Sequence, residues 1–116
     1  MHELGIVEGW LGAARAAAEG RPVKRLKVTV GEMSGADVGA LEFAFEAASP
    51  RWLGREGAVL EVRTAPARLR CGGAGGCGTE FSFAEAGAVC PACGGVDVKW
   101  LGGLELRLDS ITVEED

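Results

Sequence analysis

Four cysteines in two pairs are the residues of this sequence whose types and spacing best suit metal chemistry. Cys90 and Cys93 belong to the segment Cys-Pro-Ala-Cys-Gly, in which two intervening residues let both sulfur atoms face one ion across a tight turn. Cys71 and Cys77 are separated by five residues, four of them glycine, which form a loop flexible enough to close. Four thiolates without a nearby histidine are typical of a closed tetrahedral zinc site with a structural role. A rubredoxin-like iron site uses the same ligands, and idle or oxidised thiols are the remaining alternative.

The chain's only histidine, His2, stands beside the N-terminal amine. The α-amino group of Met1, the backbone nitrogen of His2 and its imidazole Nδ1 can close fused chelate rings around one ion, and Glu3 adds a backbone nitrogen or a carboxylate. Square-planar nitrogen donors favour nickel(II) or copper(II) over zinc, and these ions can displace an amide proton. Such a site is open at its edge and can release its ion, as a metal carrier must. The alternative interpretation is a frayed terminus whose histidine has no role.

The composition limits the classes of protein to which this chain can belong. It has 116 residues, of which 47% are apolar, and this is enough for one compact body with a small lobe. A formal charge of −5 without a basic cluster disfavours a phosphate backbone, so we expect no nucleic acid partner. Because there is no apolar run of about 20 residues and no signal peptide, we expect no membrane association and a cytoplasmic location. In that reducing compartment, regularly spaced thiols are more often metal ligands than disulfides.

Two segments carry the apolar periodicity of amphipathic helices. The first covers residues 3–19, where apolar residues recur at steps of three and four. The second begins at Asp37, a good N-cap, and reaches Ala48, where Ser49–Pro50 is predicted to end it.

Four other segments alternate between apolar and polar residues and are predicted strands. They are residues 25–30, 58–63, 96–100 and 104–113. In the last of them the alternation changes parity after Asp109, so we expect a β-bulge near Ser110 that keeps both apolar sets on one core. Gly102 and Gly103 are predicted to form a two-residue hairpin turn before Leu104.

These elements predict an α+β fold. A small three-stranded sheet with two helices forms the main domain, because each one-sided element must bury its apolar face against another. Residues 69–100 differ from the rest, since they hold all four cysteines, have little aliphatic core and interrupt the order of the strands. We therefore predict an inserted, metal-stabilised lobe over residues 69–100, while residues 1–68 and 101–116 form the main domain.

Several short motifs together resemble one known family. They are Met1–Glu3, Leu41–Glu46, Glu56–Leu60, Cys77–Phe81, Cys90–Gly94 and Gly103–Leu106. In this order they extend over nearly the whole chain and are highly specific. The sequence thus resembles the HypA/HybF family of hydrogenase nickel-incorporation proteins.

The resemblance implies a nickel metallochaperone for the maturation of [NiFe]-hydrogenase. It implies a nickel-binding domain built from both chain ends, which corresponds to residues 1–68 and 101–116. Nickel is assigned to His2, with Met1 and Glu3 contributing mainly backbone nitrogens. The implied partners are the GTPase HypB and the hydrogenase large subunit.

The resemblance also implies a zinc-ribbon domain over residues 69–100. It assigns a structural zinc to the four cysteines, Cys71, Cys77, Cys90 and Cys93. The first pair departs from the family pattern, because members usually place the first cysteine closer to the second, where Ala74 stands. Cys71 is assigned because it is the only remaining thiol.

A zinc-ribbon module that binds nucleic acid or the transcription machinery is the alternative function. The acidic charge and a terminal His2 without a role in such a module count against it. An enzyme is not expected, because no nucleophile stands with a base and the glycine-rich segment 72–76 lacks the Lys and Ser/Thr of a phosphate-binding loop. Exposed strand edges permit a homodimer without requiring one.

Overall fold

The chain forms two compact units in the computed structural model, which describes residues 3–72 and 77–114. The first unit consists of Met1–Val30, Gly35–Arg63 and Leu106–Asp116, and the second of Gly31–Ser34 and Thr64–Glu105. The second unit thus includes short segments on either side of residues 69–100. No helix in the described part of the chain is long and apolar enough to span a bilayer.

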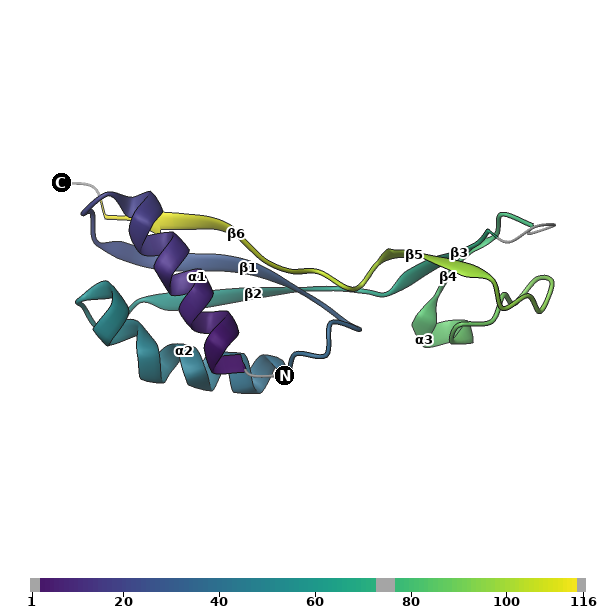
Figure 1. Cartoon of the computed structure of the whole chain (residues 1–116), viewed down its shortest axis with the longest axis horizontal. Coiled ribbons are helices and arrows are strands. Elements are labelled where there is room, and N and C mark those ends of the chain that lie inside the picture. The colour runs from purple at the N-terminus through teal and green to yellow at the C-terminus, as the bar shows by residue number, and fades with distance from the viewer. Residues whose placement is uncertain (1–2, 73–76, 115–116) are drawn as a thin grey trace. The chain divides into compact units, whose positions relative to one another are not determined.

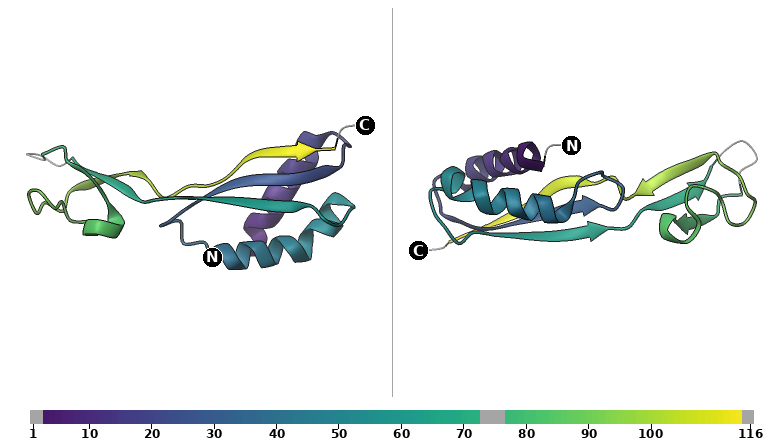
Figure 2. Two further views of the ribbon diagram at one scale, coloured as in Figure 1. Left: turned by 180° about the vertical axis from the view of Figure 1, so that it is seen from behind. Right: turned by 90° about the horizontal axis from the view of Figure 1, so that it is seen from below.

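A three-stranded sheet with strand order β2-β1-β6 forms the base of the first unit. The elements of this unit are α1 (Glu3–Ala18), β1 (Val23–Gly31), α2 (Val38–Leu53), β2 (Val59–Ala65) and β6 (Leu106–Val113). β1 and β2 run in the same direction and are connected through α2, whereas β6 is antiparallel to β1 (Figure 2). The two helices cover the same face of the sheet (Figure 1). Their apolar faces enclose the main core, which includes Leu11, Leu26, Val28, Leu41 and Phe45. The predicted α+β fold is confirmed.

Helix α2 begins where it is predicted to begin but ends later. Asp37 is its N-cap, and its Oδ1 accepts a hydrogen bond of 3.0 Å from the backbone N–H two residues later. The prediction that Ser49–Pro50 ends the helix is wrong, because the helix continues to Leu53 and is capped by Gly54 in the left-handed conformation. The additional turn places Trp52 against the main core, so tertiary packing outweighs the helix-breaking effect of the proline.

A β-bulge occurs in β6 where the sequence predicts one. The register pairs Lys27 with Ser110 and Val28 with Leu108, which makes Asp109 the extra residue. The apolar residues on both sides of the bulge pack against the main core: Leu106, Leu108, Ile111 and Val113.

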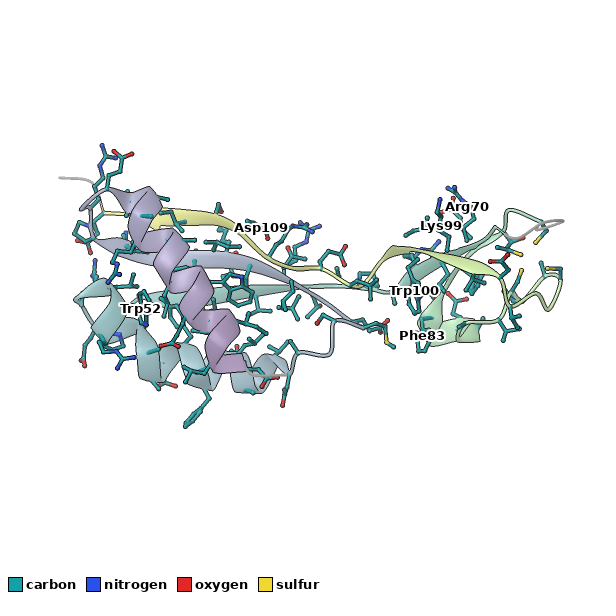
Figure 3. The ribbon with its side chains drawn as sticks, in the orientation of Figure 1. Trp52, Arg70, Phe83, Lys99, Trp100 and Asp109 are labelled. Atoms are coloured by element: carbon teal, nitrogen blue, oxygen red, sulfur yellow. The ribbon has the colours of Figure 1, made fainter. Side chains whose placement is uncertain are left out.

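The bulge residue Asp109, labelled in Figure 3, makes polar contacts with Thr29 of the neighbouring strand β1 and with Arg107 of its own strand. Its Oδ2 accepts a hydrogen bond of 2.5 Å from the buried Thr29 Oγ1, and its Oδ1 lies 2.8 Å from Arg107 Nε. The Thr29 hydrogen bond first, and then Arg107, hold the pKa of Asp109 below its ordinary value of 3.8.

Asp109→Asn is expected to lower the free energy of unfolding at about pH 6 more than at about pH 2.5. The pKa of Asp109 is lower in the folded than in the unfolded state, so its ionised form stabilises the fold above the ordinary value of 3.8. That contribution is lost as the pH falls through the lower folded-state value. Denaturant titrations of both proteins at the two pH values measure the difference. A difference that does not change with pH would show that the charge of Asp109 does not stabilise the fold.

The second unit contains a sheet with strand order β4-β3-β5 and one short helix. Its elements are β3 (Arg68–Cys71), β4 (Glu80–Ser82), α3 (Phe83–Ala86) and β5 (Val98–Gly102). The buried residues of its core are Leu69, Cys71, Phe81 and Cys90. Beside them Phe83 stacks on Trp100, with ring centroids 5.8 Å apart (Figure 3). An apolar core of this size supplies little of the free energy that a small unit needs to fold independently.

The predicted hairpin turn at Gly102–Gly103 is wrong. β5 pairs with β3, and β6 pairs with β1 in the other sheet, so the two glycines do not join paired strands. Gly103 instead has a φ of +101°, and a Cβ there would collide with the backbone of Ala67. A Cβ on Gly31 would in turn collide with the carbonyl group of Gly103. These glycines let three backbone segments of the second unit approach closely.

Gly103→Ala is therefore expected to destabilise the second unit by about 2 kcal/mol or more, because the new methyl group combines an unfavourable φ with a backbone collision. Gly102→Ala is the matched control, since its Cβ would lie 3.4 Å from Glu105 Oε2 and its φ is not positive. Calorimetric unfolding measures both variants. Equal effects of the two substitutions would contradict the close approach at Gly103.

Candidate metal centre

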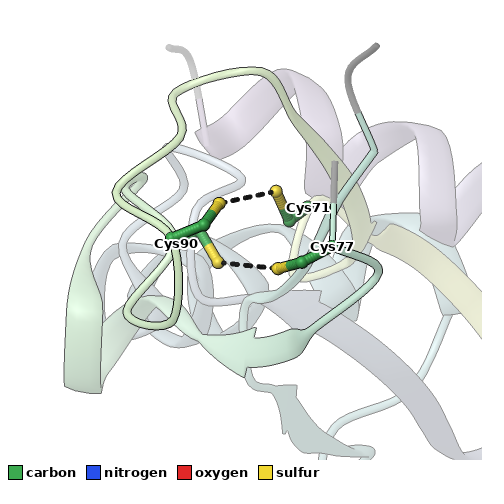
Figure 4. Close-up of side chains that lie close together, drawn as sticks. Cys71, Cys77 and Cys90 are labelled. Atoms are coloured by element: carbon green, nitrogen blue, oxygen red, sulfur yellow. Dashed lines mark hydrogen bonds between the residues drawn. The ribbon is translucent and has the colours of Figure 1, made fainter. Parts of the chain in front are cut away.

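The second unit brings together the four predicted thiol ligands. Cys71 ends β3, Cys90 and Cys93 stand between α3 and β5, and Cys77 lies just before β4. The four sulfur atoms all lie within 4.8 Å of one another. Cys71 Sγ is 3.6 Å from Cys93 Sγ, and Cys77 Sγ is 3.5 Å from Cys90 Sγ. In Figure 4 the thiols of Cys71, Cys77 and Cys90 point into the same space.

The spacing of the sulfur atoms fits a tetrahedral metal ion better than disulfides. All four cysteines are free, and their closest sulfur distances exceed the ~2.05 Å of a disulfide bond. A tetrahedral zinc ion with bonds of ~2.3 Å separates its sulfur ligands by ~3.8 Å. The two measured distances, 3.6 and 3.5 Å, are close to this value.

Two backbone hydrogen bonds within the Cys90–Gly95 segment close the turn that carries Cys90 and Cys93. The Gly94 N–H donates to the Cys90 carbonyl at 2.8 Å, and the Cys90 N–H donates to the Gly95 carbonyl at 2.9 Å. Gly94 has a φ of +74°, a conformation that glycine adopts without strain. Cys90 and Cys93 are thereby held on one side of a tight turn.

The turn that carries Cys71 and Cys77 is closed by the same pattern of hydrogen bonds. The Gly78 N–H donates to the Cys71 carbonyl at 3.0 Å, and the Cys71 N–H donates to the Thr79 carbonyl at 3.0 Å. Gly78, which follows Cys77 as Gly94 follows Cys93, has a φ of +75°. The same two backbone hydrogen bonds therefore close the base of the turn in both cysteine pairs. This is how Cys71 reaches the cluster in spite of its unusual spacing.

The hydrogen bonds of the cluster also set the ionisation of its thiols. The side chain of Thr79, 3.1 Å from Cys77 Sγ, and then the Thr79 backbone lower the pKa of Cys77 to about 6. A backbone hydrogen bond at Cys77 lowers the pKa of Cys71, but the Cys93 thiol and burial outweigh it and raise this pKa to about 11. Four thiolates this close repel one another unless a cation lies among them, so the cluster suits a divalent ion.

Sequence analysis did not single out Thr79 for a role at this site. The sequence does contain a feature that could have identified this residue, because Thr79 follows Cys77-Gly78 in one of the motifs that carry the family resemblance. The structure shows two contacts that explain the residue type, since its carbonyl closes the turn and its hydroxyl contacts Cys77 Sγ.

The other predicted metal site falls mostly outside the described residues, because Met1 and His2 precede them. Glu3 is described and is the first residue of α1. Its Oε2 accepts a hydrogen bond of 3.3 Å from the Asp37 N–H, at the N-cap of α2. The Glu3 carboxylate therefore links the first turns of the two helices.

Comparisons with known proteins agree over the whole length of the chain. A family model described as "Hydrogenase/urease nickel incorporation, metallochaperone, hypA" matches residues 1–113. The hydrogenase maturation factor HypA of Geobacter sulfurreducens is 37% identical over 114 residues, which cover 98% of this chain and 100% of that protein. The HypA of Nostoc sp. is 34% identical over 115 residues, which cover 99% and 97%.

The fold is also similar to a solved structure of known function. The solution structure of the Ni metallochaperone HypA from Helicobacter pylori superimposes with a TM-score of 0.69 at 26% sequence identity, and 100% of each chain is covered. With the family model and the curated relatives, this likeness confirms the resemblance found in the sequence. The chain belongs to the HypA family of nickel-incorporation metallochaperones.

Proposed function

We propose that this protein carries nickel(II) on a chelate formed by Met1, His2 and Glu3 at its N-terminus. It delivers the ion in the cytoplasm to the large subunit of [NiFe]-hydrogenase, together with the GTPase HypB. The four-cysteine cluster holds a structural zinc ion that stabilises the second unit. The protein is a carrier and catalyses no reaction of its own.

The convergence of all four thiols on one cluster is the observation that carries this proposal. A closed tetrathiolate site has no open position and holds its ion tightly, so it suits a structural metal. His2 is the only histidine of the chain, and the nitrogen donors around it are the ones that nickel(II) prefers. An ion that must be released is therefore assigned to the N-terminus.

The contacts of Glu3 support coordination by its backbone nitrogen. Its carboxylate accepts a hydrogen bond from the Asp37 N–H, so this side chain connects α1 to α2. A square-planar chelate needs deprotonated amide nitrogens, and the positive end of the α1 dipole stabilises negative charge there.

The charge of the second unit does not favour the alternative of a nucleic-acid-binding zinc ribbon. Its basic residues are Arg68, Arg70 and Lys99, and its acidic residues are Glu32, Glu80, Glu85, Asp97 and Glu105. A tetrathiolate zinc site adds further negative charge. Phosphate backbones are bound by an excess of basic side chains, which this unit does not have.

His2→Ala is expected to lose nickel binding and to keep one zinc ion per chain, because the two metals use different donors. Glu3→Gln is the matched control, since it changes the neighbouring side chain and keeps the backbone nitrogen. Calorimetric titration with nickel and metal analysis of the untagged proteins test this. Nickel affinity that is unchanged in His2→Ala would show that nickel binds elsewhere, and the thiols would be the next donors to test.

Delivery is tested by mixing the nickel-loaded protein with metal-free hydrogenase large subunit, with and without HypB and GTP. We expect nickel to appear in the separated large subunit, and faster in the presence of HypB and GTP. Nickel that stays on the carrier under both conditions would contradict delivery to this partner.

A further inference from the structure

A groove of about 560 Å³ lies in the first unit between α2 and the start of β2. One wall is formed by Glu42, Phe45, Glu46 and Ser49 of α2, and the other by residues 56–60. These walls coincide with two of the sequence motifs that carry the family resemblance, Leu41–Glu46 and Glu56–Leu60. Neither motif contributes a ligand to the proposed nickel or zinc sites, so the groove has no role in metal binding as proposed above.

The backbone beside this groove can accept another strand. β2 is an outer strand in the order β2-β1-β6, and one of its edges has no partner strand in the described part of the chain. Unpaired N–H and C=O groups along such an edge are a template for a further strand. A helix beside an edge strand adds side-chain pockets to that template, and extended peptides bind in such places by continuing the sheet.

The lining of the groove has an apolar floor and an acidic rim. Phe45 and Ser49 are buried, and Ala58 and Leu60 pack against the main core from the strand side. The rim carries the carboxylates of Glu42, Glu46 and Glu56. No basic residue lines the groove, and among the described residues none of these three carboxylates forms an ion pair.

We propose that this groove binds an extended, basic segment of a partner protein, which adds to the free edge of β2 as a strand. In an extended segment alternate side chains point in opposite directions, so apolar residues enter the floor while Lys or Arg residues meet the rim. The charge of the groove selects this partner over a second copy of the chain. A second copy carries the same acidic rim and the same formal charge of −5.

A synthetic nonapeptide of alternating Lys and Val, blocked at both ends and fluorescently labelled, is the probe for this proposal. Two further versions carry N-methyl groups on alternate backbone amides, one version for each edge of the extended peptide. N-methylation removes hydrogen-bond donors along one edge and leaves the charge unchanged. We expect the parent peptide to bind the full-length, zinc-loaded protein, and one of the two methylated versions to bind at least about tenfold more weakly than the other. No binding of the parent peptide, or equal affinity of the two methylated versions, would overturn strand addition.

The acidic rim is tested by a pair of double variants with equal charge changes. Glu42→Gln/Glu46→Gln is expected to weaken binding of the parent peptide about fivefold, because each rim carboxylate contributes a partly exposed ion pair. Glu19→Gln/Asp97→Asn alters exposed carboxylates elsewhere and is expected to bind as the unaltered protein does. Equal weakening by both double variants would show unspecific attraction to an acidic protein and overturn the proposal.

Amide chemical shifts of the ¹⁵N-labelled protein locate the bound peptide. We expect the largest changes over residues 42–50 and 56–65, which include the whole of β2. Largest changes in the second unit or at the N-terminus would overturn the proposed site. A dimer that forms without peptide and is dissociated by the parent peptide would assign the edge to a second copy and equally overturn it. The metal contents of the variants are independent of these outcomes, so the nickel proposal is tested separately.

Discussion

Cys90→Ala is expected to remove zinc from the protein and to unfold the second unit, while the first unit stays folded. The buried core of the second unit consists of Leu69, Phe81 and two of the four thiols. Structural zinc contributes about 10 kcal/mol or more to the folding of such small domains, far more than this core supplies. The first unit has its own apolar core, which contains no residue of the cluster.

Hydrogen exchange followed by mass spectrometry measures this directly. Amides of residues 64–105 should lose their protection in Cys90→Ala, whereas those of α1, α2 and β1 should keep it. Val89→Ala is the matched control, because Val89 adjoins Cys90 and is 45% exposed. Native-like protection of residues 64–105 in zinc-free Cys90→Ala would contradict a structural role for the metal.

The parts of the fold that sequence predicts best depend on neighbouring residues alone. The bulge at Asp109 follows from a change of parity within one strand, and a strand with one buried face must correct that change locally. The N-cap at Asp37 likewise depends on the two or three residues that follow it.

The incorrect predictions concern contacts between distant segments. Pro50 does not end α2, because packing of Trp52 on the core stabilises one more turn. Gly102–Gly103 has the composition of a hairpin turn, but the close approach of Ala67 and Gly31 to Gly103 explains the second of these glycines better. No local pattern shows which distant backbone will lie against a glycine.

The sequence predicts which four cysteines form the thiol cluster, but it does not predict how the turn that carries Cys71 and Cys77 is closed. The spacing of Cys71 and Cys77 is longer than a common metal-binding turn. The structure shows that the hydrogen bonds made by Gly78 and Thr79 close the same base as in the Cys90–Gly95 turn. The longer spacing is tolerated because the two ends of the segment are joined by the same hydrogen bonds. The nickel ligands Met1 and His2 stay a prediction from the sequence and the family resemblance.

Extension of the chain before Met1 is expected to abolish or reshape nickel binding, although every side chain remains. The amine of Met1 carries a basic lone pair, whereas the amide nitrogen that replaces it in an extended chain does not. The fused chelate rings around His2 then lose their terminal donor. Nickel binding to the chain that begins at Met1 should also strengthen as the pH rises toward and above ~8, because protons compete for the amine. Zinc binding should be the same in both forms, because the thiols are unaffected.

Nickel titration of the untagged protein and of a form with a short N-terminal extension tests the central claim most directly. Calorimetry gives the affinity, and absorbance in the visible range reports square-planar nickel. We predict a square-planar spectrum and tight binding only for the untagged protein, with one zinc ion per chain in both forms. Equal nickel affinity and the same spectrum in the two forms would contradict a nickel site built on the N-terminal amine.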